Sequence, residues 1–184
     1  PQTIVSRCQQ IYCDALTDED IASALTERMS ILSDEARLIS SFAQGSYSRA
    51  CDFLDENMRS MRHEVVDLLR ASLKRTFYRV DVLSHLDKMT GEKDRTRVEM
   101  MLMLLMMWIR DCYAFTVARN DAPIINIDQR ETIEKFANAF SEADYNAAII
   151  AVENAISNIR RNVHIQLTMI TLLISCRKIF LGMN

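Results

Sequence analysis

The sequence predicts an all-α protein, and three observations lead to that prediction. Only 3 glycines and 2 prolines occur in 184 residues, so few positions interrupt a helix. Apolar residues recur three and four positions apart along most of the chain, which is the spacing of one helix face. Thr17 with Asp20, and Asp128 with Glu131, have the three-residue spacing of helix-start capping boxes. We therefore expect a three-helix domain followed by a bundle of five or six helices.

The first part of the chain is predicted to hold a short extended segment and then three short helices. Residues 4–16 alternate loosely between apolar and polar side chains, which favours extended backbone. The three-helix unit covers residues 17–57: one helix from Thr17 to about Met29, a second from Ser33 that Gly45 ends, and a third after it. The predicted inward faces are Ile21, Leu25, Met29 and Leu32; Leu38, Ile39 and Phe42; and Tyr47, Ala50, Cys51 and Leu54.

Residues 58–184 are predicted to form a bundle of longer helices. A polar stretch from Lys88 to Asp94 connects the first to a helix over about residues 95–118, and residues 120–128 form the next loop. Asp128 with Glu131, and Ser141 with Asp144, then mark two helix starts. The predicted apolar stripes are Met61, Val65, Leu68, Leu69, Leu73 and Phe77; Ile149, Val152, Ile156 and Ile159; and Val163, Leu167, Ile170, Leu173 and Ile174.

The run from Met100 to Trp108 is apolar on every side of a helix. Such a helix usually lies at the centre of a bundle, and burial is the interpretation that we favour. The alternative is a flexible methionine-rich groove that accepts peptide helices, as in promiscuous binding proteins.

Basic residues gather near the end of the first long bundle helix and in the turn that follows. Acidic neighbours such as Asp67 and Asp81 dilute this stripe, so a solvated helix face is the first interpretation. Contact with a nucleic-acid backbone or an acidic partner is the alternative. The stripe consists of Arg70, Lys74, Arg75, Arg79, Lys88, Lys93, Arg95 and Arg97.

A nucleotide-binding loop and a metal site are both disfavoured. The three glycines are isolated, so no glycine-rich loop can cradle phosphates, and the three histidines lack metal-ligand spacing. No spacing marks a catalytic triad, although a triad forms in space and sequence does not exclude one. We expect no cofactor, no metal and no enzymatic activity of this chain alone. The residues in question are Gly45, Gly91, Gly182, His63, His85 and His164.

Charge and cysteine content favour a cytoplasmic protein. The net charge of −3 gives no global reason to expect nucleic acid or a membrane surface as the main partner. The apolar run from Val98 to Ile109 is shorter than the 18 or so residues that cross a bilayer, so no membrane span is expected. The 5 scattered cysteines fit reduced thiols better than disulfides. Polar residues after Pro1 argue against a signal peptide and suggest a piece of a longer protein.

Two segments in the first third of the chain carry a family resemblance. The chain opens with Thr3-Ile4-Val5-Ser6-Arg7-Cys8-Gln9, and residues 43–50 read Ala43-Gln44-Gly45-Ser46-Tyr47-Ser48-Arg49-Ala50. The first resembles the SRC motif (Ser6, Arg7, Cys8) of clamp-loader subunits of the AAA+ class, and the second resembles that family's small helical lid (Gly45, Ser46, Arg49). Trp108-Ile109-Arg110-Asp111, the segment Ile124-Ile125-Asn126-Ile127-Asp128 and residues 158–162 resemble the collar bundle of the bacterial DNA polymerase III delta-prime subunits.

This resemblance implies a domain division and one transferable site. Residues 1–16 would be the end of an AAA+ ATPase-type domain, residues 17–57 the lid, and residues 58–184 the collar. In the family the SRC arginine reaches ATP bound by a neighbouring subunit, so Arg7 would act as an arginine finger in trans. A planar, permanently charged guanidinium suits that task because it stabilises charge on the transferring phosphoryl group. Ser48 stands where ATP-binding subunits carry the lid arginine, with Arg49 one step later, which favours a non-hydrolysing stator subunit.

The implied partners are the gamma/tau and delta clamp-loader subunits and, through them, the sliding clamp and primed DNA. A homodimer of the chain is a further alternative. Two other functions stay open: the lid and collar of a gamma/tau motor subunit, and a stand-alone helical adaptor that uses the methionine-rich groove.

Overall fold

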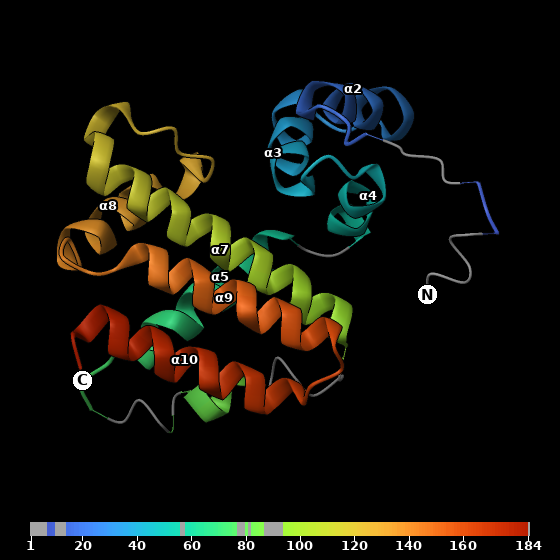
Figure 1. The fold of residues 1–184 in the computed structure, drawn as a ribbon. Helices are drawn as coiled ribbons and strands as arrows, with labels where there is room; N and C mark the ends of the chain where they lie inside the picture. The colour runs from blue at the N-terminus through green and yellow to red at the C-terminus, as the bar shows by residue number, and fades with distance from the viewer. Residues whose placement is uncertain are drawn as a thin grey trace. The chain divides into compact units, whose positions relative to one another are not determined.

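The computed structural model describes residues 7–9, 14–55, 58–76, 80, 82–86 and 94–183. All regular structure in these ranges is helical, and no strand occurs within them, which confirms the all-α prediction (Figure 1). The contacts divide the chain into two compact units, Pro1–Asp52 and Phe53–Asn184. Each unit has buried apolar residues of its own and is described separately below.

The first unit is built from α2 (Asp18–Met29), α3 (Ser33–Ala43) and the start of α4 (Tyr47–Asp55). The predicted capping box is present, because the Asp20 amide donates to Thr17 Oγ1 at 3.1 Å and the Thr17 amide donates to Asp20 Oδ2 at 3.4 Å. Such a box satisfies amides that the first helical turn leaves without partners. The core of the unit holds Ile21, Leu25, Ala36, Ile39, Phe42, Ala43 and Ala50.

Two residues of the predicted inward face of this unit are exposed. Met29 is 46 % exposed and Leu32 is 77 % exposed. The reason is the left-handed backbone of Ser30 (φ 57°), which ends α2 and turns the chain before Leu32 becomes the residue preceding α3. The predicted inward face therefore extended past the end of α2, to Leu32. Of the predicted extended segment, residues 14–17 have no regular structure, and residues 4–6 and 10–13 lie outside the described ranges.

Four long helices close a ring in the second unit. They are α5 (Met58–Ser72), α7 (Arg95–Ala118), α9 (Tyr145–Arg160) and α10 (Ile165–Leu181). Along this ring α5 contacts α7, α7 contacts α9, α9 contacts α10, and α10 returns to α5, while α8 (Arg130–Ala139) covers α7. Figure 1 shows α9 and α10 side by side and antiparallel. Two short 3₁₀ turns, η1 (Arg119–Asp121) and η2 (Ile127–Gln129), lie in the connection from α7 to α8.

Helix α7 is the core of this bundle. Met101, Leu102, Leu104 and Trp108 are at most 1 % exposed, and Met106 is the one partly exposed residue between Val98 and Ile109 apart from Glu99. Burial of the methionine run is thereby confirmed, and α7 presents no open methionine-rich groove. The segment Arg95–Asp121, 27 residues, is long and apolar enough to cross a membrane, but 67 % of its most apolar window is buried inside the unit. A helix that is apolar all round and covered by its neighbours is a core helix.

Asp144 caps α9, because its Oδ1 accepts from the Ala147 amide at 2.9 Å. The expected helix is present, but the start predicted at Ser141 was too early, since Ser141 lies in the turn before the cap. The start predicted at Asp128 was wrong: α8 begins at Arg130 after a 3₁₀ turn, without a side-chain cap. The Asp128 carboxylate binds Arg62 of α5 instead.

Helix α10 buries a face that shares Leu173 with the predicted stripe and otherwise differs from it. Val163, Leu167 and Ile174 are exposed. The buried side consists of Ile165, Thr168, Met169, Leu172, Leu173, Cys176 and Phe180. Because α10 is apolar on most of its circumference, its sequence period does not choose which apolar line faces the core. In α5, the helix ends at Ser72, and the predicted stripe residue Phe77 lies outside the described residues.

Candidate functional site

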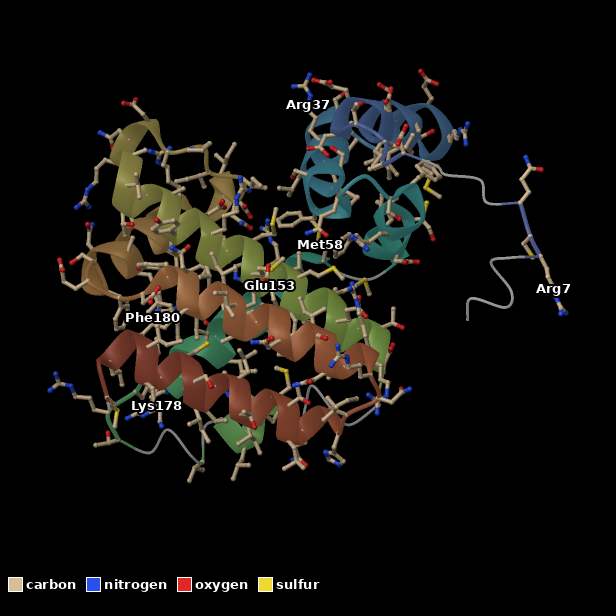
Figure 2. All side chains as sticks on the ribbon, viewed as in Figure 1. Arg7, Arg37, Met58, Glu153, Lys178 and Phe180 are labelled. Carbon is tan, nitrogen blue, oxygen red and sulfur yellow. The ribbon has the colours of Figure 1, made fainter. Side chains whose placement is uncertain are left out.

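The N-terminal motif is exposed in the part that the structure describes. Ser6 lies outside the described residues, whereas Arg7 and Cys8 are both exposed (Figure 2). Cys8 carries a free thiol. An exposed guanidinium in this position is accessible to another molecule.

The predicted lid residues meet at the corner between α3 and α4. Ser46 Oγ accepts from the Arg49 amide at 3.3 Å, and Arg49 Nη1 donates to Ala43 O at 3.3 Å and to Gln44 Oε1 at 3.1 Å. The Arg49 guanidinium therefore satisfies the last carbonyl of α3, that of Ala43, a frequent role for a basic residue near a helix C-terminus. These contacts tie α4 to the end of α3.

Gly45, in the same corner, touches the linker that precedes α2. Its backbone is left-handed (φ 77°), and its carbonyl accepts from the Leu16 amide at 3.0 Å. A Cβ atom added at Gly45 would lie 2.5 Å from Ala15 Cβ and 3.1 Å from Leu16 O. Only glycine permits this approach, because any side chain would overlap Ala15 and would also strain the backbone.

Several residues of the basic stripe have partners within the second unit. Arg97 pairs with Glu64 at 3.0 Å, and Arg70 pairs with Asp67 at 3.4 Å. Arg95 Nη1 donates to Ile159 O at 3.3 Å and to Val163 O at 2.9 Å, so it caps the end of α9. Lys74 and Arg75 are exposed, and the remaining predicted members, Arg79, Lys88 and Lys93, lie outside the described residues. The solvated-face interpretation accounts for these contacts without a nucleic-acid partner.

The structure brings together a buried polar group that the sequence analysis did not find. Arg62, 2 % exposed on α5, donates from Nη1 to Asn126 Oδ1 at 3.2 Å and from Nη2 to the Asp128 carboxylate. Asp111 of α7, fully buried, accepts at Oδ2 from the amides of Ile125 (3.1 Å) and Asn126 (2.8 Å) and from Asn126 Nδ2 (2.7 Å). We call Arg62, Asp111 and Asn126 the buried network; the Asp128 side chain, which pairs with Arg62 at the edge of this network, is 50 % exposed.

This buried network fixes the connection between α7 and α8 to the bundle. A buried charge is tolerated only when hydrogen bonds replace its lost hydration, and Arg62 and Asp111 use the loop for that purpose. A sequence signal was available: Arg62 lies four positions from Met58 and from Val66, both buried, so a charged residue occupies an apolar helix line.

The outer surface of α9, of α10 and of the turn between them carries four large exposed apolar side chains. Ile150 is 55 %, Val163 41 %, Leu167 62 % and Ile174 49 % exposed. We call this surface the α9–α10 face. Single exposed apolar residues are ordinary, but a set gathered on two adjacent helices is typical of a protein-binding surface.

Two grooves flank the exposed line of α10. The first, about 310 Å³, lies between α9 and α10. Its lining residues are small or polar for the most part: Ala151, Asn154, Ala155, Asn158, Val163, Leu167, Thr168, Thr171, Leu172 and Ser175. The second, about 330 Å³, is lined by Ser72, Val82, Leu83, Ile170, Leu173, Ile174 and Arg177. A ridge between two grooves offers the shape into which helices of another protein pack.

The described residues contain no group of three or more His, Cys, Asp or Glu side chains that could hold a metal ion. The buried thiols are unreactive by their surroundings: burial raises the pKa of Cys112 well above its ordinary value, and burial raises the pKa of Cys176 to about 12. Neither thiol is a nucleophile near neutral pH.

Comparison with known proteins identifies the second unit. No curated protein matches the chain. Residues 59–178, which extend from α5 into α10, match the family described as "DNA polymerase III, delta subunit, C terminal". This finding supports a clamp-loader subunit, as the resemblance implied, but it names delta where the resemblance indicated delta-prime. Since the match covers more than half of its residues, the chain belongs to the family of the C-terminal region of the DNA polymerase III delta subunit.

Proposed function

We propose that the chain is the lid and collar portion of a clamp-loader subunit of bacterial DNA polymerase III. In this proposal the second unit is the collar, which packs against the collars of sister subunits, and the first unit is the lid, which orients an ATPase-type domain. The assembled complex loads the sliding clamp onto primed DNA in the cytoplasm. The chain hydrolyses no ATP itself, and Arg7 reaches ATP held by a neighbouring subunit.

The α9–α10 face is the observation that carries the assembly role. It lies within the region that matches the family. Its exposed side chains Ile150, Leu167 and Ile174 are not part of the buried core of the unit. Burying such a side chain fully contributes about 1.5–3 kcal/mol, so several together can hold a subunit in a complex. The small residues of the groove between α9 and α10 allow a partner helix to approach closely.

The family match favours a delta-type subunit over delta-prime. The matched region begins at residue 59, so the SRC-like and lid segments, on which the stator and finger roles rest, contribute nothing to it. A gamma/tau motor subunit is the remaining clamp-loader alternative. An intact P-loop in a preceding AAA+ domain would favour the motor subunit, and a degenerate one would favour a stator.

The assembly role can be tested by placing a charge on the α9–α10 face. We expect Leu167→Glu with Ile174→Glu to weaken entry into the complex with sister clamp-loader subunits at least 30-fold or so, because both carboxylates would be desolvated on binding. The measurement is the dissociation constant from analytical ultracentrifugation, with circular dichroism to verify the helical fold.

Ile127→Glu is the matched control for this experiment. Ile127 is 74 % exposed and lies in the connection from α7 to α8, so it belongs to neither helix of the α9–α10 face. It should leave the dissociation constant within about twofold of the unmodified chain. Equal affinity of the Leu167/Ile174 double variant and the unmodified chain would refute the assignment of the interface to this face.

A further inference from the structure

The outer side of α10 carries a second apolar line besides the one that is buried in the core. Leu167 and Ile174 are 62 % and 49 % exposed, and the half-buried Ile170 and Leu181 continue the same side. The four residues follow one another at intervals of three, four and seven positions, which is the spacing that a helix presents to a single partner helix. An amphipathic helix is the element that fits such a line.

The two helices of the α9–α10 face also carry an excess of positive charge. Between Tyr145 and Leu181 the chain has four basic residues and one acidic residue, a formal net charge of +3 with histidine counted as neutral. The whole chain, in contrast, carries −3. The basic residues are Arg160, Arg161, Arg177 and Lys178, and the acidic residue is Glu153. Lys178 and Glu153 are labelled in Figure 2.

Two of these basic residues bind groups of the second unit itself. Arg160 pairs with Glu99 of α7 at 2.7 Å, and Arg177 Nη1 donates to two backbone carbonyls at and just beyond the end of α5, at 2.6 and 2.7 Å. The other two, Arg161 after α9 and Lys178 in the last turn of α10, are exposed. They lie near opposite ends of α10, so positive charge borders its outer apolar line at both ends.

Both exposed charges are on the outward side of their helices. Lys178 follows Ile174 by four positions, and Arg161 follows Ile150 by eleven, so in each case about a whole number of helical turns separates the charge from an exposed apolar residue. A partner that covers the apolar side chains therefore also meets Arg161 and Lys178.

These charges decide between a second copy of the chain and a different partner. None of the 17 residues of α10 is acidic. In a parallel pair of α10 helices Lys178 would lie beside its counterpart, and in an antiparallel pair it would lie toward the end that carries Arg161. Each copy has only Glu153 on these two helices to offset the repulsion. Like charges that meet across an interface disfavour that partner.

A nucleic-acid backbone would pair with the basic residues but would leave Leu167 and Ile174 in water, so the apolar line favours a protein. We propose that the α9–α10 face binds an amphipathic helix of a different chain, whose apolar line is bordered at both ends by Asp or Glu side chains. This inference rests on the proposed assembly role, and it adds the chemistry of the partner helix.

The charge of the partner is tested by association kinetics with sister clamp-loader subunits. Arg161→Glu with Lys178→Glu should slow association about tenfold at low salt, because electrostatic attraction accelerates the encounter, and the difference should shrink in roughly 0.5 M salt. Glu153→Lys should speed association, since it adds charge of the attracting sign. Stopped-flow fluorescence measures the rates, and circular dichroism verifies the helical fold of each variant.

Arg110→Glu with Lys135→Glu is the matched control. Both residues are exposed, neither belongs to α9 or α10, and the pair changes the net charge by the same amount. Because steering depends on where the charges lie, this variant should slow association less than about threefold. A tenfold effect of the control as well would refute a local role of Arg161 and Lys178.

The remaining outcomes separate the partner's chemistry from the interface itself. Unchanged rates in both Glu153→Lys and the Arg161/Lys178 variant, together with weakened binding of the Leu167/Ile174 double variant, would overturn the acidic partner and leave the interface in place. If the Leu167/Ile174 variant also bound normally, the interface of the proposed function would fall.

The two other occupants are tested with the unmodified chain alone. Sedimentation equilibrium should show a monomer, and a dimer that Leu167→Glu with Ile174→Glu dissociates would identify a second copy as the occupant and overturn the inference. Fluorescence anisotropy with primed DNA should show no binding that depends on Arg161 and Lys178. DNA binding that the Arg161/Lys178 variant loses, while its association with sister subunits stays normal, would assign these charges to nucleic acid instead.

Discussion

At the scale of single residues, two arginines stabilise the fold although charged side chains are usually assigned to the surface. Arg62 is charged, and yet it is 2 % exposed because the connection from α7 to α8 supplies Asn126 and Asp128 as partners. Arg49 resembles a functional lid residue, and its guanidinium caps α3. In each case the role of the arginine follows from the carbonyl or carboxylate groups that the fold brings to it.

Removing the Arg62 side chain should destabilise the second unit strongly. Arg62→Ala leaves a cavity and takes the donor from the buried Asn126 Oδ1, whereas the half-exposed Asp128 carboxylate regains water, so we expect a loss of about 2 kcal/mol in the free energy of unfolding. Urea denaturation followed by circular dichroism measures this value.

Arg70→Ala is the control for Arg62, because Arg70 lies on the same helix and pairs with Asp67 while both remain more than half exposed. An exposed pair contributes little, and the loss should stay below about 0.5 kcal/mol. Similar losses for the two variants would contradict the role assigned to the buried network.

At the scale of helices, the spacing of apolar residues predicted well which segments are helical and roughly where they lie in the chain. It predicted less well which face of each helix is buried. The inward faces of α5 and α9 follow the predicted stripes at Met61, Val65, Val152 and Ile156. In α5 polar residues occupy the opposite side, which makes the inward face unambiguous. In α10 the sequence Ile165–Leu181 is apolar nearly all round, and the packing against α9 and α5 selects which line is buried. The exposed line that remains, with Leu167 and Ile174, belongs to the proposed interface.

The methionines of α7 provide a prediction at this scale. If they fill the core, as their burial indicates, Met101→Leu and Met103→Leu should change the free energy of unfolding by less than about 1.5 kcal/mol and leave assembly unaffected. Met103→Glu should unfold the unit, since it places an unpaired carboxylate in the core. Thermal denaturation gives the stabilities, and a large effect of the leucine variants on partner binding with unchanged stability would revive the methionine-rich groove.

At the scale of the whole molecule, the chain consists of two units with separate cores. The first is small, and small domains bury a lower share of their surface on folding, so it should be the less stable of the two. The domain division expected from the resemblance, at residues 57 and 58, and the contact division after Asp52 differ by a few residues of α4.

Separate cores predict separate responses to mutation. Leu25→Ala, at a fully buried position of the first unit, should cost about 2–5 kcal/mol there and raise amide hydrogen exchange in α2 and α3. Exchange in α7 and α9 should stay as in the unmodified chain. Hydrogen exchange with mass spectrometry resolves the helices, and faster exchange throughout both units would contradict two independent cores.

The sequence by itself determined the helical class, the capping box at Thr17 and the burial of α7, because each depends on neighbours within about four residues along the chain. Only the tertiary structure decided the burial of Arg62 with Asp111, the contact of Gly45 with Ala15 and the face that α10 exposes. These features join residues that are distant in sequence. Their energies depend on which groups are in contact in the folded chain, and the local spacing of residues does not specify those contacts.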